Sequence, residues 1–241
     1  MSSPQCFENP PALVPPRAGS ETVHELAGLK AYVAGPPDSK RAVILIADVF
    51  GYEAPNLRKF ADRCASSGFL VVVPDFFYGD PIDANNFDKI DRDAWRKIHN
   101  TEKGYEDALK VVKALKSKGV SAVGASGYCW GGVVVAKLAG SGELQAGVIL
   151  HPGKITEDEI KAVKTPTAIL GAEIDHSSPP DILQKYGEIL SAKSEFESYV
   201  KIFPRVPHGW SMRYKEDDEF AIKSAEEAHQ DTLNWFLKHV K

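Results

Sequence analysis

Short apolar runs with little polar alternation recur along the chain, separated by stretches with helical spacing. Such runs are typical of strands buried on both faces, as in a parallel sheet that helices cover. They span residues 42–47, 69–73, 120–125, 146–150 and 167–170, and a further strand-like run covers 198–203. Ahead of them, residues 22–26 and 29–33 flank Gly28 and predict a short antiparallel hairpin.

Helices are predicted between these strands. Within residues 56–67, apolar side chains recur at i, i+3, i+4 and i+7, and Gly68 stands where a helix C-cap belongs. Further helix candidates cover 102–118, 133–139, 181–191 and 219–240. This alternation predicts a single α/β domain whose mostly parallel central sheet is flanked by helices on both faces. We expect the domain to span residues 21–241, after a proline-rich leader over residues 1–20.

Composition excludes several classes of protein. The 241 residues are 43% hydrophobic and 26% charged, which supplies a core without metals or disulfides. The net charge is −4 and both signs are interspersed, so we expect no nucleic-acid partner. No apolar run approaches the roughly 20 residues of a membrane span, and no signal peptide is evident, so no membrane partner is expected.

Three cysteines, an odd number, make neither a disulfide framework nor a zinc motif. We therefore expect a reduced, cytoplasmic protein, a monomer or weak homodimer, that carries no metal and no cofactor. Cys64 lies on the apolar face of its predicted helix and is interpreted as core. Cys6 lies in the leader and is predicted to be an exposed bystander.

Cys129 stands at the centre of the most informative motif, Gly127-Tyr128-Cys129-Trp130-Gly131-Gly132. The motif follows a predicted strand and precedes a predicted helix, with glycines two residues on either side of the cysteine. These are the requirements of a nucleophile elbow, in which the chain turns sharply and the nucleophile takes a strained conformation. A thiol at a helix N-terminus also experiences the positive end of the helix dipole, which favours the thiolate. The alternative is that Cys129 is a small buried hydrophobe.

A cysteine hydrolase also needs a histidine oriented by a carboxylate. Elbow folds present the acid and then the histidine on loops after later strands. Asp175, just past the run 167–170, is the preferred acid, with Glu173 as its competitor. His208 is the preferred base because it follows the last predicted strand and precedes the final helix, and His176 is its rival. Each could instead have a structural role, Asp175 as a turn or capping residue.

With these residues in this order, the chain resembles the dienelactone hydrolase family, the carboxymethylenebutenolidase-like enzymes of the α/β-hydrolase fold. The resemblance covers nearly the whole chain after the leader. The segments Gln5–Pro11 and Val73–Asp80 look most like plant members, some of which carry an endo-β-glucanase label. The resemblance implies a Cys129–His208–Asp175 triad.

The resemblance also implies further site residues. The oxyanion hole would be the backbone amides of Trp130 and Val49, and Arg213 matches an arginine that binds a substrate carboxylate. Asp48 stands where bacterial members have a glutamate that keeps the resting thiol neutral. No match for the family's second carboxylate-binding arginine is evident. We also expect Phe50, Tyr128 and Trp210 to line the pocket, although such aromatic residues are equally common in cores.

The predicted function is cysteine-dependent hydrolysis of small, anionic enol-lactones or activated esters through a thioester acyl-enzyme. One alternative is a glycoside hydrolase, which would need two carboxyl groups such as Asp48 and Asp175 across a sugar-binding cleft. A second alternative is a non-catalytic relative that binds a small molecule in the same pocket.

Overall fold

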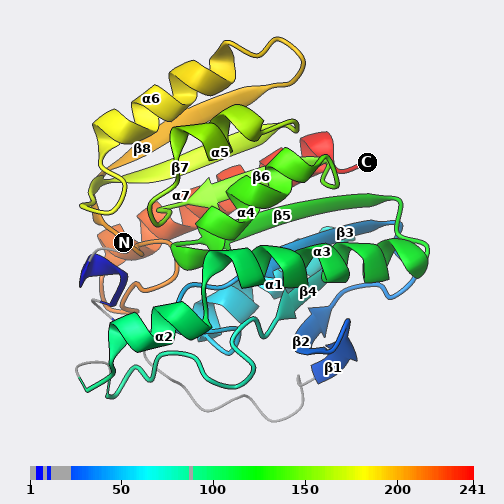
Figure 1. Ribbon diagram of the computed structural model, residues 1–241, viewed down its shortest axis with the longest axis horizontal. Coiled ribbons are helices and arrows are strands. Elements are labelled where there is room, and N and C mark those ends of the chain that lie inside the picture. The colour runs from blue at the N-terminus through cyan, green and yellow to red at the C-terminus, as the bar shows by residue number, and fades with distance from the viewer. Residues whose placement is uncertain (1–3, 8–9, 12–22, 87–88) are drawn as a thin grey trace.

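The computed structural model describes residues 4–7, 10–11, 23–86 and 89–241. These residues form an eight-stranded sheet in the order β1-β2-β4-β3-β5-β6-β7-β8 (Figure 1). β2 pairs antiparallel with β1 and β4, and the remaining neighbours are parallel. The strands are β1 (Val23–Leu26), β2 (Leu29–Ala34), β3 (Arg41–Ile46), β4 (Leu70–Pro74), β5 (Ala122–Tyr128), β6 (Ala146–Leu150), β7 (Thr167–Ile174) and β8 (Ser198–Pro207).

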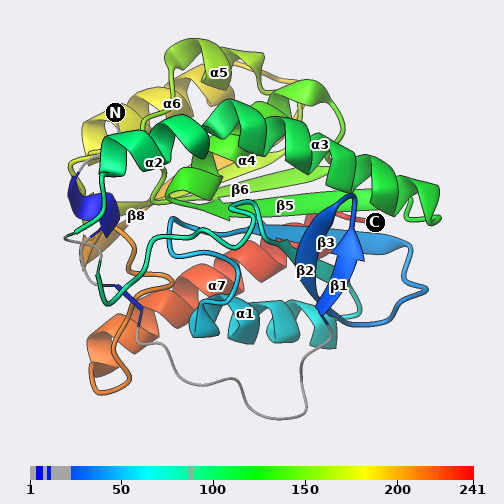
Figure 2. The same cartoon turned by 60° about the horizontal axis from the view of Figure 1, so that its bottom comes forward.

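Helices cover both faces of the sheet, as Figure 2 shows. One face carries α1 (Pro55–Ser66) and α7 (Glu219–His239). The other side carries α2 (Arg92–Ile98), α3 (Thr101–Ser117), α4 (Trp130–Ser141), α5 (Glu157–Ala162) and α6 (Pro180–Ser191). The predicted α/β class, with a mostly parallel sheet between two helical layers, is confirmed.

The continuous apolar runs are explained by burial on both sides of the sheet. Side chains of a strand point alternately to its two faces. In β3, Ile44 joins the core under α3 and α4, whereas Val43 and Leu45 join the core under α1 and α7. Because helices exclude water from both faces of the sheet, the residues that point to either face are apolar.

The structure differs from the sequence expectation at short elements. The helices α2 and α5 were not predicted, because each is only two turns or less and is defined by its cap rather than by periodicity. The Asp91 side chain accepts hydrogen bonds from the first turn of α2, and Thr156 forms a capping box with Glu159 at α5. β5 also extends to Tyr128, beyond the predicted end at residue 125, because Ser126 and Gly127 pair with both β3 and β6.

Most of the predicted leader lies outside the described residues, as does residue 22 of the predicted hairpin. Within residues 1–20, the structure describes residues 10–11 and the short 3-10 helix η1 (Pro4–Phe7). The boundary at residue 20 therefore stays a prediction. None of the described helices is both long enough and apolar enough to cross a membrane.

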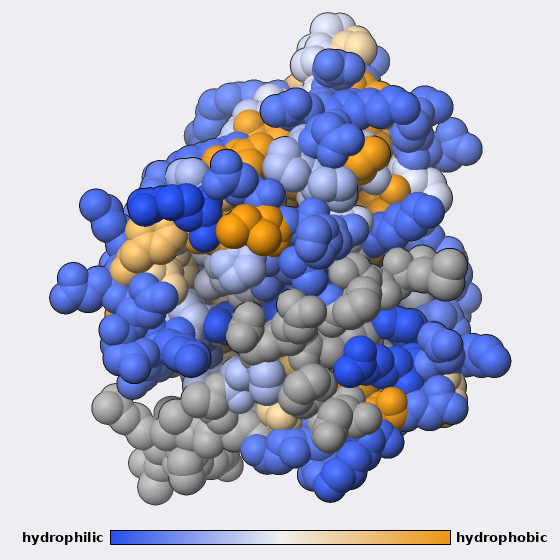
Figure 3. All heavy atoms as spheres, turned by 90° about the vertical axis from the view of Figure 1, so that its left-hand side faces the viewer, coloured by the Kyte–Doolittle hydropathy of each residue, from blue (hydrophilic) through white to orange (hydrophobic). Residues whose placement is uncertain are grey.

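The parallel strands end at the edge of the sheet where η1 lies (Figure 1). Figure 3 shows the molecule from this side, where hydrophilic side chains dominate and hydrophobic ones appear in small separate groups. Loops that follow parallel strands meet at such an edge, so the residues after β5, β7 and β8 are brought together here.

Gly104 sets how closely α3 approaches α4 beside the elbow. A Cβ at Gly104 would lie 2.4 Å from Cη2 of Trp130. The indole cannot easily move, because its Nε1 donates a 2.9 Å hydrogen bond to the His99 carbonyl. We predict that Gly104→Ala lowers the free energy of unfolding by about 1–3 kcal/mol through overpacking, although alanine is otherwise favoured inside a helix.

Denaturant unfolding measures this difference, with Lys113→Ala on the exposed face of α3 as the control. If Gly104→Ala and Lys113→Ala had the same free energy of unfolding, α3 and α4 could move apart without loss of stability, and the prediction would be wrong.

Candidate active site

Cys129 connects β5 to α4 in a left-handed backbone conformation, with φ 52° and ψ −108°. A non-glycine residue in such a conformation costs about 1–3 kcal/mol, which surrounding contacts must offset. The backbone N–H of Cys129 donates to the Leu150 carbonyl at 3.1 Å. Its carbonyl accepts from Gly132 at 3.1 Å and from Gly153 at 2.9 Å. The turn is thus fixed by hydrogen bonds on both sides of the cysteine.

The glycines that flank Cys129 are required by close backbone contacts. A Cβ at Gly127 would lie 2.1 Å from the Gly131 carbonyl oxygen. A Cβ at Gly131 would lie 2.1 Å from the Ile46 carbonyl oxygen, at the end of β3. No side chain fits at either position, so the motif has the tight geometry that a nucleophile elbow needs.

His208 follows β8 and is hydrogen-bonded to Asp175, which follows β7. Nδ1 of His208 lies 2.7 Å from Oδ2 of Asp175, and both side chains are fully buried. The other carboxylate oxygen of Asp175 accepts from the backbone N–H groups of Ser177 and Ser178. Asp175 is therefore held rigidly as the partner of one ring nitrogen.

The two rival residues lie elsewhere. Glu173 is exposed and accepts a 2.6 Å hydrogen bond from the backbone N–H of Arg205. His176 is also exposed, and its backbone N–H donates to Oε1 of Gln5 at 2.5 Å. The structure thus pairs the acid and the histidine that the sequence analysis preferred.

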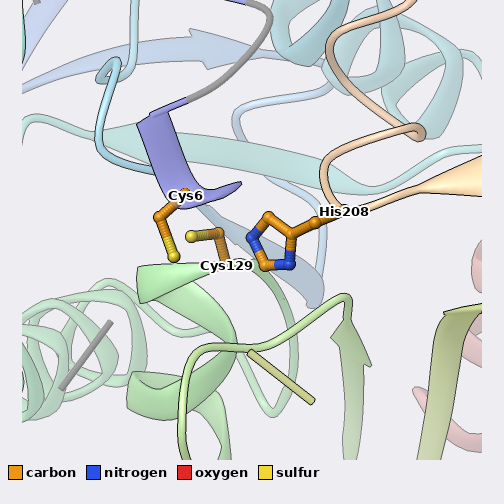
Figure 4. A group of neighbouring side chains, drawn as sticks. All are labelled: Cys6, Cys129 and His208. Atoms are coloured by element: carbon orange, nitrogen blue, oxygen red, sulfur yellow. The ribbon is translucent and has the colours of Figure 1, made fainter. Parts of the chain in front are cut away.

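Cys6 lies in the same cluster, and the prediction that it is an exposed bystander is wrong. Its side chain is 0% exposed, and that of Cys129 is 1% exposed. The two sulfur atoms and a ring nitrogen of His208 all lie within 4.8 Å of one another. Figure 4 shows the three side chains converging from η1, from the elbow and from the loop after β8.

Electrostatics couple these three side chains. The hydrogen bond with Cys129 lowers the pKa of Cys6 well below its ordinary value, although burial opposes this, and His208 lowers it further. The same hydrogen bond, together with burial, raises the pKa of Cys129. Burial acts to lower the pKa of His208, but Asp175 and Cys6 outweigh it and raise the pKa to about 8. The cluster therefore favours an imidazolium beside a Cys6 thiolate, with Cys129 as the thiol that donates to it. The expectation that the helix N-terminus makes Cys129 the thiolate is not met in this arrangement.

Arg213 and Asp48 form a buried ion pair next to the cysteines. Nε of Arg213 lies 3.5 Å from Oδ2 of Asp48, and Nη1 donates to the Cys6 carbonyl at 3.2 Å. The guanidinium packs onto Gly209, where a Cβ would lie 2.0 Å from Nη2. Arg213 therefore points into the site, on the Asp48 side of the thiols. Oδ1 of Asp48 accepts from the backbone N–H of Phe50 at 3.0 Å.

The predicted pocket aromatics occupy two different layers. Phe50 belongs to the hydrophobic cluster that contains Cys6 and Cys129, with the Arg213 guanidinium 5.5 Å from its ring centre. Tyr128 and Trp210 belong to the cluster on the other face of the sheet. The ring centres of Trp210 and His151 are nevertheless 5.1 Å apart, and those of His151 and His208 are 5.2 Å apart. Whether these residues contact substrate stays a prediction.

Trp130 and Val49, whose amides form the predicted oxyanion hole, follow two neighbouring strands of the sheet. Trp130 is the first residue of α4, where backbone N–H groups have no partner within the helix. Val49 lies three residues beyond the end of β3, the strand adjacent to β5. Their roles stay predictions.

Two thiols and an imidazole are also the donor types that bind zinc, and Asp175 on the second ring nitrogen is a common arrangement in such sites. An ion here would occupy both the candidate nucleophile and the candidate base. The sequence-based prediction of a metal-free site stays a prediction.

Cys6 is the site residue that the sequence analysis missed. It lies 171 residues from Ser177, with which its sulfur is in contact at 3.5 Å. No periodicity or spacing links such distant residues. The signal available was weak: Cys6 lies in Gln5–Pro11, a segment that resembles plant members of the family, and this says nothing about its place in the fold.

A family model described as the dienelactone hydrolase family matches residues 29–240. The chain belongs to the dienelactone hydrolase family. Its members are hydrolases of small lactones or esters, and the fold described above is that of this family. A carboxymethylenebutenolidase homolog from Xenopus tropicalis is 34% identical to this dienelactone hydrolase family member and covers 90% of the chain and 89% of its own length.

A protein from Zea mays named endo-1,3;1,4-beta-D-glucanase is 42% identical over 79% of this chain. The match spans 63% of the length of the Zea mays protein. Among solved structures, dienelactone hydrolase from Anabaena variabilis superposes with a TM-score of 0.67 at 16% identity, over 88% of this chain and 93% of its own. That likeness supports the shared fold.

His208 gives this family member a characteristic dependence of stability on pH. Its pKa is raised from 6.5 to about 8 in the folded protein. The folded state therefore binds the proton more tightly, and the resulting stability is fully present below pH 6.5 and is lost as the pH rises through about 8. We predict that this contribution is about 2 kcal/mol, and that it is absent from His208→Gln.

Urea unfolding between pH 6 and 9 measures the difference between wild type and variant. His229→Gln is the control, because burial lowers the pKa of His229 to about 4. Its contribution is present above pH 6.5 and is lost only as the pH falls towards 4. If the free energy of unfolding changes equally with pH in wild type and His208→Gln above pH 6.5, the His208–Asp175 ion pair is contradicted.

Proposed function

We propose that this protein is a cysteine-dependent hydrolase of small, anionic enol-lactones or activated esters. The observation that carries the proposal is the position of Cys129. Cys129 lies in a strained turn at the start of α4, and its sulfur is within 4.8 Å of a ring nitrogen of His208. The His208 ring is also hydrogen-bonded to the buried Asp175 carboxylate. A nucleophile, a base and a group that orients the base are the elements of covalent acyl transfer.

In the proposed reaction the Cys129 thiol passes its proton to the Cys6 thiolate as η1 shifts, and the resulting Cys129 thiolate attacks the substrate carbonyl beside the protonated His208. The oxyanion that forms would be stabilised by the backbone amides of Trp130 and Val49. Preorganised donors of this kind are each worth roughly 3 kcal/mol in the transition state. The enolate or alcohol leaves with the proton from His208, and His208 then activates a water molecule that hydrolyses the thioester. Asp175 keeps the imidazole oriented throughout.

Enolates suit this chemistry because they are good leaving groups. A thiolate attacks readily but is itself easily expelled from the tetrahedral intermediate, so a poor leaving group would favour reversal. Arg213 places a guanidinium against Cys6, and it would attract a substrate carboxylate. Because Cys129 is 1% exposed, a substrate reaches its sulfur only when η1 shifts.

The glucanase name of the Zea mays relative makes glycoside hydrolysis the second candidate. That chemistry needs two carboxyl groups free to exchange protons or attack carbon. Both oxygens of Asp175 accept hydrogen bonds from His208, Ser177 and Ser178, and Asp48 is paired with Arg213. These contacts favour the thiol mechanism over a carboxylate mechanism.

The test compares wild type with Cys129→Ala on a dienelactone, p-nitrophenyl acetate and mixed-linkage β-glucan. We predict that Cys129→Ala lowers kcat/KM for the lactone and the ester by at least about 10³-fold, as loss of a nucleophile does elsewhere. Cys64→Ala is the control, since Cys64 is buried in α1 on the other face of the sheet. Glucan cleavage that survives Cys129→Ala would overturn the proposal in favour of a carboxylate mechanism.

Arg213→Lys tests the proposed preference for anions. The lysine keeps the positive charge but loses the planar fork that binds a carboxylate through two hydrogen bonds. We predict a 10- to 100-fold higher KM for a carboxylate-bearing lactone, from the loss of about 1.5–3 kcal/mol, and little change for p-nitrophenyl acetate. An equal effect on both substrates would show that Arg213 acts only by holding η1 and Asp48.

A further inference from the structure

The two cysteines of the site form a pair that no sequence spacing suggests. Cys6 comes from η1 and Cys129 from the elbow, and their sulfur atoms lie within 4.8 Å of each other. Both side chains are buried, and Figure 4 shows the two sulfurs pointing into the same space. Cys64, the third cysteine, is buried in a different hydrophobic cluster.

Specific polar contacts place η1 over the elbow. Gln5 accepts from the backbone N–H of His176 at 2.5 Å and donates to the Ile174 carbonyl at 3.5 Å. Arg213 donates to the Cys6 carbonyl at 3.2 Å. These contacts come from the loops after β7 and β8, so the Cys6 thiol is held at the nucleophile by the same loops that carry the acid and the base.

η1 can make the short approach that a bond between the sulfurs needs, since side-chain contacts rather than sheet pairing hold it in place. It pairs with no strand of the sheet. A disulfide requires a sulfur–sulfur distance of about 2.05 Å and a Cα–Cα distance of about 4.4–6.8 Å. The elbow backbone is fixed by three main-chain hydrogen bonds, whereas η1 is held by side-chain contacts of Gln5 and Arg213, so we assign the approach to η1.

We propose that Cys6 and Cys129 are an oxidation site, which a hydroperoxide converts into an intramolecular disulfide and a dithiol converts back. In the first step the thiolate attacks the peroxide O–O bond, giving a sulfenic acid and releasing water from hydrogen peroxide or an alcohol from an organic hydroperoxide. In the second step the other thiol attacks the sulfenic sulfur, the S–S bond forms, and water leaves. Two electrons pass from the thiols to the peroxide, and a dithiol returns them by exchange.

The neighbouring groups favour both steps. A thiolate is the form that reacts with peroxide, and in this cluster Cys6, beside the His208 ring and the Cys129 thiol, is the sulfur that carries the charge. The His208 imidazolium can protonate the leaving oxygen. The second thiol is already in contact with the first, so the sulfenic acid is captured before a second peroxide can oxidise it to the irreversible sulfinic acid. The disulfide would hold η1 over the elbow and take up the Cys129 sulfur. The expected loss of hydrolytic activity rests on the proposed function of Cys129, whereas formation of the disulfide does not.

The experiment uses the full chain, reduced with dithiothreitol, desalted into buffer with a chelator, and treated with hydrogen peroxide at a few equivalents. We expect the intact mass to fall by that of one hydrogen molecule. We also expect non-reducing peptide mapping to recover a fragment that joins Cys6 to Cys129. Lactone hydrolysis should fall in step with this fragment and return after dithiothreitol.

Cys6→Ser is the decisive variant, and Cys64→Ala is the matched control. Cys6→Ser should form no internal disulfide, should accumulate sulfinic acid at Cys129, and should recover at least tenfold less activity after dithiothreitol than wild type. Cys64→Ala should behave as wild type. Absence of the Cys6–Cys129 fragment, or recovery of Cys6→Ser as complete as that of wild type, would overturn the inference.

The readouts separate this inference from the proposed function. If the disulfide forms and the oxidised protein still hydrolyses the lactone at full rate, the oxidation site stands and Cys129 is not the nucleophile. If hydrolysis depends on Cys129 but no disulfide forms, the proposed function stands and the oxidation site does not.

Discussion

The close approach of three backbone segments at the elbow is the constraint on which the site depends. β3, β5 and the start of α4 meet where Gly127 and Gly131 leave no room for a Cβ, and the Ile46 carbonyl contacts Gly131 directly. This contact forces the chain to turn within one residue, and Cys129 takes the positive φ that results. The strain is offset by the hydrogen bonds to Leu150, Gly132 and Gly153, which themselves tie the elbow to β6. Cys129 is thus positioned by main-chain packing, and its side chain needs no hydrogen bond to keep it in place.

The parallel order of the sheet then determines which loops can reach the elbow. β6, β7 and β8 follow β5 one after another, so the loops after β7 and β8 lie along the same edge. Asp175 and His208 occupy these loops, and the backbone N–H of His208 donates a hydrogen bond to the Ile174 carbonyl. Their hydrogen bond is therefore a consequence of strand register as much as of side-chain chemistry. The dyad is built on rigid strand ends, which suits groups that must keep a fixed orientation.

Sequence patterns predicted the parts of the fold whose physics is periodic or local. The run 146–150 matches β6 because every residue in it is buried, and the elbow was recognisable because glycine spacing around a cysteine reflects main-chain contacts. Short capped helices such as α5 carry only a local signal. Cys6 could not be predicted to lie in the site, because its burial depends on contacts with Arg213 and with the loop after β7, far away in sequence. The inward direction of Arg213 likewise depends on Gly209, whose missing side chain makes room for the guanidinium.

Charge balance explains why the site holds Asp48 so close to its thiols. Burial raises the pKa of Asp48, and the Arg213 guanidinium 3.5 Å away opposes this rise. An ionised Asp48 adds to the rise in the pKa of Cys129, while Arg213 acts in the other direction. A substrate carboxylate that drew Arg213 away from Asp48 would change both effects at once, since the carboxylate would lose its partner and the elbow thiol would experience a different field. The same guanidinium also holds the Cys6 carbonyl, so any group that competes for Arg213 loosens η1 as well. In the proposed function, binding of an anion, access to Cys129 and the ionisation of the thiols would therefore be linked through Arg213.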